Sequence, residues 1–286
     1  PTGAGKTRVA VEATVRLAAS GQLQGPVLWI AQTEELCEQA VQAWSYVWRA
    51  IGDGPMQISR FWSQNSAEEA GYGVFQIIVC TMAKLGNAVN DPRYEWMRRA
   101  GLIIIDAAHG AITTSYTQVL TWLGGERTVQ ALQTPLLGLT ATAFRGTSEV
   151  ETDRLVNRFG SNKLDAGVFG EEEPYAYLQR MGILAQVRQK TLEGMDIEIR
   201  EQDRAQFQQM RRLSRETEAL VGQNTHRNRV ILDSVIDQPD DWTTLLFATS
   251  VEHANALAAE LSYYDVPARP IHSGTDAARR RRDIEQ

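Results

Sequence analysis

The sequence is poor in the features that mark secreted and membrane-spanning proteins. It contains two cysteines among 286 residues, Cys37 and Cys80, and their spacing fits neither a disulfide framework nor a metal site. No apolar run approaches the roughly 20 residues that span a bilayer, and no signal peptide is visible. We therefore expect a cytoplasmic protein without a membrane partner.

Positive charge is also scarce. The formal net charge is −6, so no overall basic field predicts nucleic-acid binding, and any such binding must come from local grooves and backbone amides. The apolar fraction is 43% and the charged fraction is 22%, values typical of a folded soluble chain. The length is sufficient for two domains of ordinary size.

The most informative stretch is an apolar strand that ends in an acid. Residues 102–105 are four apolar residues, three of them β-branched, a pattern typical of a central strand in a parallel sheet. Asp106 follows where this strand would leave the sheet. Ligands of open α/β sheets bind at the carboxyl ends of the strands, so Asp106 is a candidate ligand-binding residue.

The chain opens with Pro-Thr-Gly-Ala-Gly-Lys-Thr, which is nearly all of a phosphate-binding P-loop. Gly3, Ala4 and Gly5 would let backbone amides approach the phosphates, and Lys6 would place its charge on the β and γ oxygens. The apolar spacing over 7–19 predicts a helix that begins at the loop and directs its positive end at the phosphates. Because a P-loop normally follows a strand, and neither that strand nor the loop's first glycine is present, we expect a fragment of a longer protein.

The loop and Asp106 together predict an ATP site with a magnesium ion. Thr7 and Asp106 are the two protein groups expected to hold the metal. Arg8, the next residue along the predicted helix, is included among the expected ATP-binding residues.

The stretch Asp106-Ala107-Ala108-His109 resembles the DEAH box of superfamily 2 helicases. In that family a glutamate stands at the position of Ala107, where it orients and deprotonates the water that attacks the γ-phosphate. The resemblance implies catalytic roles for Lys6, Asp106 and His109, with the general base missing. Since losing a positioned base typically costs about 10²–10⁴-fold in rate, we expect this chain to bind ATP and to hydrolyse it poorly. A deliberate Glu→Ala change and a natural loss of the base both stay open.

Two further stretches resemble helicase motifs. Thr140-Ala141-Thr142 resembles motif III, which implies that the hydroxyls of Thr140 and Thr142 bond to the DEAH loop and couple γ-phosphate loss to domain movement. Residues 32–36, Gln-Thr-Glu-Glu-Leu, resemble motif Ia, although Thr33 would serve equally well as a plain helix cap. The expected nucleic-acid contacts are Thr33, Glu34, Thr81, Arg145, Ser250 and His272, with Tyr116 as a further candidate.

The resemblance implies an α/β architecture of two tandem RecA-like P-loop NTPase domains with parallel sheets, the second one truncated. We expect the first domain at 1–146, an interdomain crossing at 147–174 and a partial second domain at 175–286. In the second domain, 243–250 and 267–271 are expected as strands and 203–221 as one helix. Motifs V and VI, which supply the arginine finger in the family, are absent from this sequence.

The expected function is that of an ATP-dependent nucleic-acid helicase or translocase, with partner subunits of a larger complex as an option. DNA is preferred over RNA by resemblance alone, because phosphate contacts do not distinguish them. DNA repair, restriction and genome defence against viruses stay open as pathways. Two alternatives are a natural ATP-gated DNA clamp or scaffold without turnover, and a P-loop switch protein that binds no nucleic acid.

Overall fold

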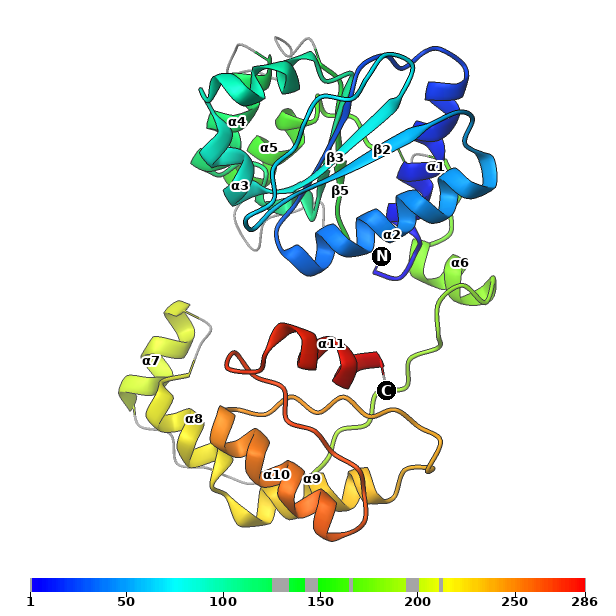
Figure 1. Cartoon of the computed structure of the whole chain (residues 1–286). Coiled ribbons are helices and arrows are strands. Elements are labelled where there is room, and N and C mark those ends of the chain that lie inside the picture. The colour runs from blue at the N-terminus through cyan, green and yellow to red at the C-terminus, as the bar shows by residue number, and fades with distance from the viewer. Residues whose placement is uncertain are drawn as a thin grey trace. The chain divides into compact units, whose positions relative to one another are not determined.

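The computed structural model describes residues 2–124, 134–141, 149–164, 167–193, 201–210 and 213–285. The chain divides into two compact units, Pro1–Gln186 and Val187–Gln286 (Figure 1). Within the described residues, no helix has the length and apolar character of a membrane span. Both cysteines are free thiols and both are buried.

The first unit is built on a parallel five-stranded sheet with the strand order β2-β3-β1-β4-β5. This confirms the predicted α/β fold with a RecA-like parallel sheet. The strands are β1 (Val27–Ala31), β2 (Met56–Phe61), β3 (Phe75–Thr81), β4 (Leu102–Asp106) and β5 (Leu136–Leu139).

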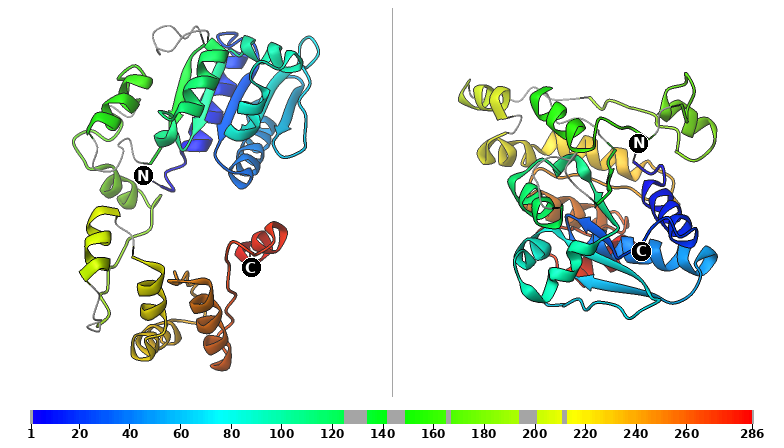
Figure 2. Two further views of the ribbon diagram at one scale, coloured as in Figure 1. Left: turned by 90° about the vertical axis from the view of Figure 1, so that its left-hand side faces the viewer. Right: turned by 90° about the horizontal axis from the view of Figure 1, so that it is seen from above.

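The central strands are apolar throughout because helices cover both faces of the sheet (Figure 2). Every residue of β1 is buried, and alternate side chains enter opposite layers: Trp29 joins one cluster while Leu28 and Ile30 join the other. The Trp29 layer is covered by α1 (Lys6–Ala19) and α2 (Glu34–Ile51).

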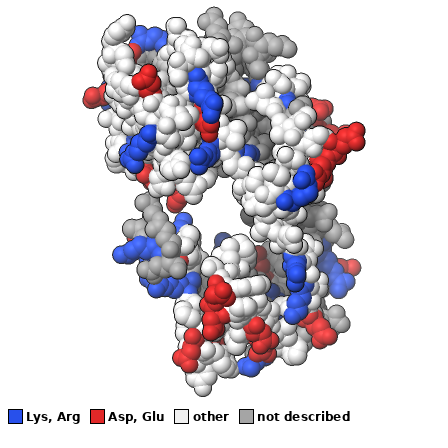
Figure 3. Space-filling model, turned by 90° about the vertical axis from the view of Figure 1, so that its right-hand side faces the viewer, with Lys and Arg blue, Asp and Glu red and all other residues white. Residues whose placement is uncertain are grey.

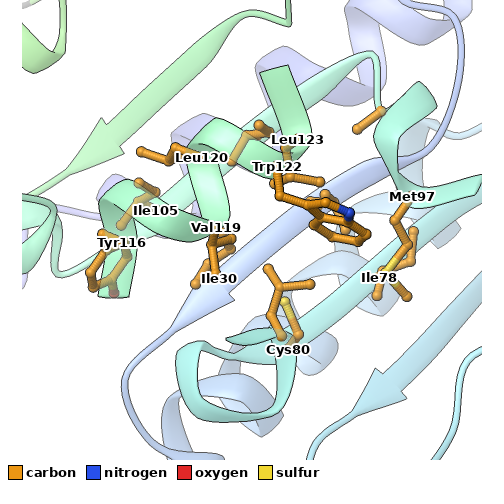
Figure 4. Packing of buried hydrophobic residues seen from close by; sticks show 14 of the residues in the cluster. Ile30, Ile78, Cys80, Met97, Ile105, Tyr116, Val119, Leu120, Trp122 and Leu123 are labelled. Atoms are coloured by element: carbon orange, nitrogen blue, oxygen red, sulfur yellow. The ribbon is translucent and has the colours of Figure 1, made fainter. Parts of the chain in front are cut away.

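The opposite layer is covered by α3 (Met82–Ala88), η1 (Pro92–Arg99) and α4 (Thr114–Gly124). Figure 4 shows side chains of α4, among them Val119, packed with Ile30 and Ile105 of the central strands. The two layers hold the carboxyl ends of β1, β3 and β4 in a fixed arrangement at one edge of the sheet.

The segment expected as an interdomain crossing contains a helix that packs on the first unit. This helix, α5 (Glu149–Arg158), places Leu155 in the core with 4% exposure. The Arg158 guanidinium donates to Thr117 Oγ1 at 2.8 Å. The next helix, α6 (Pro174–Arg180), also lies in the first unit, whose boundary falls after Gln186.

The second unit differs from expectation because its described residues contain no strand. Its helices are α7 (Glu201–Met210), α8 (Arg215–Gly222), α9 (Thr225–Ile236), α10 (Val251–Tyr263) and α11 (Ala277–Glu285). The strands predicted at 243–250 and 267–271 are wrong for this structure, since a strand requires a hydrogen-bonded neighbour. Leu245 and Phe247 are 76% and 84% exposed, so no apolar layer covers the first of these segments.

The single helix predicted at 203–221 is also wrong. Ser214 begins a new helix there, because its side chain accepts a hydrogen bond from the backbone N–H of Thr217. The core of this unit is small and centres on Leu232, Leu257 and Leu261.

Candidate nucleotide and nucleic-acid site

The P-loop leads directly into α1. Gly3 and Gly5 have φ angles of +78° and +77°, in the left-handed region that favours glycine, and Gly5 is the N-cap of α1. No acidic residue lies in the first turn of this helix. The helix start therefore presents unneutralised backbone N–H groups, together with Lys6 and Thr7, to a bound anion.

Lys6 and Asp106 act on each other across the sheet edge. Asp106 ends β4 and is half-buried, and burial raises the pKa of its carboxyl group. Two groups oppose this effect of burial and lower the pKa. The backbone N–H of Ala107 donates to Asp106 Oδ1 at 2.9 Å, and Lys6 contributes its positive charge. The P-loop lysine therefore lies near enough to the acid of the central strand for its charge to lower the pKa of that acid.

The side-chain oxygen atoms of Thr7 and Asp106 are of the type that binds magnesium. Mg²⁺ prefers hard oxygen ligands and is usually bound by one or two carboxylates, phosphates and water. The carboxylate of Asp106 and the hydroxyl of Thr7 are groups of this kind. Among the described residues there is no group of three or more His, Cys, Asp or Glu side chains that could hold a metal ion by themselves.

We expect the substitution Asp106→Asn to raise the melting temperature of the protein, although it removes a functional group. A raised carboxyl pKa means that the folded state disfavours the ionised form, so charged Asp106 destabilises the fold at pH 7. Protonated Asp106 stabilises the folded state fully at pH values below the pKa of an unfolded aspartate. This stabilisation is lost as the pH rises through the higher pKa of the folded state.

Differential scanning calorimetry at pH 7 measures this effect. The matched control is Asp91→Asn, because hydrogen bonds from Arg93 lower the pKa of Asp91 and its charge is favoured by the fold. A melting temperature that falls for Asp106→Asn as it does for Asp91→Asn would contradict the prediction.

Ala107 has an unusual backbone conformation. Its φ and ψ are 56° and 49°, in the left-handed region, and it precedes the short 3₁₀ turn η2 (Ala108–Gly110). This conformation lets its N–H reach Asp106, while its carbonyl lies 3.5 Å from the side-chain amide of Gln32. His109 is half-buried within η2.

The motif III segment runs beside this turn. Leu139, the last residue of β5, is the register partner of Asp106, so Thr140 leaves the sheet next to the turn after β4. Thr140 is half-buried. Thr142 and Arg145 lie outside the described residues, and their predicted roles stay predictions.

Thr33 and Thr81 lie at the same edge of the sheet. Thr81 pairs in register with Ala31, two residues before Thr33. Each threonine caps a helix: Thr33 accepts a hydrogen bond from Leu36 N and Thr81 accepts one from Lys84 N. Both helices therefore begin at the carboxyl edge of the sheet, α2 over the Trp29 layer and α3 over the opposite layer.

Three further predicted residues of the first unit are Glu34 and Tyr116, expected to contact nucleic acid, and Arg8, expected to bind ATP. Glu34 is exposed in the first turn of α2, where its charge favours the helix but would repel a phosphate. Arg8 places its guanidinium 4.9 Å from the ring of Tyr46 on α2. The prediction for Tyr116 is wrong, because this side chain is 4% exposed in the core and burial raises its pKa to about 12.

Two predicted contacts belong to the second unit. Ser250 caps α10 by accepting a hydrogen bond from His253 N. His272 shapes its own turn, since its backbone N–H donates to Thr275 Oγ1 and its Nδ1 accepts from Gly274 N. The face in Figure 3 shows basic and acidic side chains interspersed, so a wide basic surface does not cover it.

His253 links α9 and α10 inside the second unit. Its Nδ1 accepts from the backbone N–H of Thr249, and its Nε2 lies 3.0 Å from Asn228 Oδ1. Burial, and then the charge of Arg227, lower the pKa of the imidazole, whereas Glu260 raises it. The fold therefore favours the neutral ring with its proton on Nε2.

We expect α9 and α10 to lose stability as the pH falls below the ordinary imidazole value of about 6.5. Because the folded state lowers the pKa of His253, neutral His253 stabilises the fold fully above the ordinary value. This stabilisation is lost as the pH falls from the ordinary value toward the lower pKa of the folded state. Hydrogen exchange of the two helices between pH 7.5 and 5.5 measures the effect. His253→Gln should abolish the pH dependence, and His226→Gln, at an exposed histidine of α9, should leave it intact.

Comparisons with known proteins found a family model and solved structures to which this chain is similar. The chain is similar to the Hef helicase domain of Pyrococcus furiosus, with 19% sequence identity and a TM-score of 0.42. The similarity covers 93% of this chain and 48% of that one, so the chain spans about half the length of this structural relative. No curated protein matches the sequence.

The family model that matches the sequence is described as the Type III restriction enzyme, res subunit, and it matches residues 1–145. These residues contain the P-loop, β1 to β5 and the turn after β4. Because the match covers just over half of the 286 residues, the chain belongs to the family of the type III restriction enzyme res subunit.

Proposed function

We propose that this chain carries the ATP-binding part of a nucleic-acid helicase or translocase that acts on DNA. Family membership supports a helicase-type P-loop domain. The observation that carries the nucleotide proposal is the P-loop, in which Gly3 and Gly5 adopt left-handed conformations and lead into α1, while Asp106 ends the central strand β4. In this site Lys6 binds the β and γ phosphates, and Thr7 and Asp106 hold the metal.

ATP hydrolysis is slow in this proposal because Ala107 lacks a proton acceptor. The cradle, the cation and the metal ligands stay in place, so binding is kept while activation of the attacking water is lost. His109 and Thr140, both beside the turn after β4, would sense the γ-phosphate. The same observation favours a second function, a natural ATP-gated DNA clamp without turnover, and the residue encoded at position 107 in the native gene separates the two.

Nucleic acid binds, in this proposal, at the edge formed by the starts of α2 and α3. The amides at the two helix starts and the hydroxyls of Thr33 and Thr81 are suited to phosphate oxygens. Such contacts carry no base sequence information, so binding is expected to be sequence-independent and to weaken as salt rises.

The test separates capping from phosphate contact at the same residue. Aspartate caps a helix at least as well as threonine, so Thr33→Asp keeps α2 stable while its charge repels a phosphate. We expect Thr33→Asp to weaken the binding of a fluorescent single-stranded DNA by about tenfold, the scale of one lost hydrogen bond to a charged group. Fluorescence anisotropy with and without ATP and Mg²⁺ measures this, and an RNA of the same sequence tests the preference for DNA.

The matched control is Ser214→Asp, which changes the cap of α8 in the same way but lies far along the chain in the second unit. Its DNA affinity should equal that of the unchanged protein. Equal DNA affinity for Thr33→Asp would remove α2 from the nucleic-acid site. Absence of DNA and RNA binding in the unchanged chain would instead favour a P-loop switch protein.

A further inference from the structure

The side chain of Gln32 reaches across the sheet edge to the turn after β4. Its Nε2 lies 3.5 Å from the carbonyl oxygen of Ala107, a residue 75 positions away in the sequence. The same nitrogen is 3.1 Å from the point where a Cβ on Gly110 would stand. The amide of Gln32 thus occupies a space that exists because residue 110 has no side chain.

The backbone of Gln32 is fixed on both sides. Ala31 before it is the fully buried last residue of β1, and Thr33 after it caps α2. β1 and β4 are neighbours, with Ile30 paired to Ile105, so the turns that follow the two strands leave the sheet side by side. A displacement of the start of α2 therefore moves Gln32 relative to the Ala107 turn.

The other end of the contact lies on a strained peptide next to the metal-binding acid. Ala107 is in the left-handed conformation, and its N–H holds Asp106 Oδ1. Its carbonyl accepts from Gly110 N at 3.4 Å and faces the Gln32 amide. Gln32 thus contacts the carbonyl of the residue whose N–H orients the Asp106 carboxylate.

We propose that Gln32 is a positioning residue that couples the nucleic-acid edge at the start of α2 to the nucleotide site at Asp106. The inference rests on the proposed function, because it assigns a link between the two sites named there. When a polynucleotide binds at the start of α2, Gln32 holds the Ala107 turn in the conformation that orients Asp106 toward the metal. Gln32 itself touches neither reacting group.

The experiment measures the linkage between two bound ligands. The affinity for a fluorescent ATP analogue with Mg²⁺ is determined with and without saturating single-stranded DNA, and the ratio of the two values is the coupling. Couplings between sites commonly amount to about 5–150-fold, and we expect a ratio in this range for the unchanged chain. Gln32→Met, which keeps the length of the side chain but removes the N–H donor, should bring the ratio to about one.

A second variant disturbs the contact between Gln32 and Ala107 by a change at Gly110. Gly110→Ala places a methyl group 3.1 Å from Gln32 Nε2, so the flexible amide must move away, and we expect the same loss of coupling. The control Gln39→Met alters an exposed glutamine of α2 and should keep the ratio. Affinity for each ligand alone should stay within about twofold for the two glutamine variants, since substitutions at exposed positions usually change little. A merely structural role would change these single affinities or the melting temperature.

The outcomes separate this inference from the proposed function. If the unchanged chain binds both ligands and Gln32→Met or Gly110→Ala keeps the coupling, the role of Gln32 is refuted while the proposed function stands. If both ligands bind with a ratio of one in the unchanged chain, the coupling role is refuted alone. If either ligand fails to bind, the proposed function is refuted and this inference with it.

Discussion

The substitution Ala107→Glu should increase DNA-stimulated ATP hydrolysis by about 10²–10⁴-fold, the usual contribution of a positioned general base. The turn that would carry the glutamate is already formed. Ala107 follows Asp106, the proposed metal ligand. Its N–H donates to Asp106 Oδ1, and its carbonyl faces Gln32. A carboxylate added here would extend from a fixed backbone beside the site of the γ-phosphate.

The measurement is phosphate release at saturating ATP and Mg²⁺, with and without single-stranded DNA. Ala107→Gln is the matched control, because glutamine has the size of glutamate but accepts no proton, and its rate should stay close to that of the unchanged chain. Taking the ratio of the two variants cancels any loss that they share. A glutamate variant no faster than the glutamine variant would refute the assignment of position 107 as the base.

The second large effect is expected from Lys6→Ala, which should weaken the binding of a fluorescent ATP analogue by about 10–100-fold. Hydrogen bonds to charged groups contribute roughly 1.5–3 kcal/mol each, and in the proposed site Lys6 supplies such bonds to the β and γ phosphates. Its loss has a further consequence at the metal. The charge of Lys6 opposes the effect of burial on Asp106, so without it the pKa of that carboxyl rises further and Mg²⁺ meets more competition from protons.

Titration of the analogue at pH 7, with and without Mg²⁺, separates the two contributions. Lys84→Ala provides the control, because Lys84 Nζ donates to the carbonyl of Ser63 at 2.8 Å and has no place in the P-loop. Equal affinities for the Lys6 and Lys84 variants would mean that the opening loop does not hold the nucleotide phosphates.

The sequence by itself determined the parallel sheet of the first unit and the residues of the proposed nucleotide site. Central parallel strands are buried on both faces, so β1 and β4 are uninterrupted apolar runs that can be recognised without a structure. The glycines of the P-loop and the acid at the end of β4 follow equally local rules. These features depend on residues adjacent in the chain.

The tertiary structure decided which side chains meet. Sequence gave no sign that Gln32 reaches Ala107, because that contact depends on β1 lying beside β4 and on the absence of a side chain at Gly110. Tyr116 is polar enough for a surface position, yet the packing of α4 buries it.

The second unit shows the same limit. Residues 243–250 have the composition of a strand, but a strand forms only where a neighbour pairs with its backbone, and the described residues of this unit provide no such neighbour. Local composition determines helices, caps and buried central strands, because their hydrogen bonds or burial patterns involve residues that are close together in the sequence. Pairing between distant segments, and the side-chain contacts that follow from it, is decided only when the whole chain has folded.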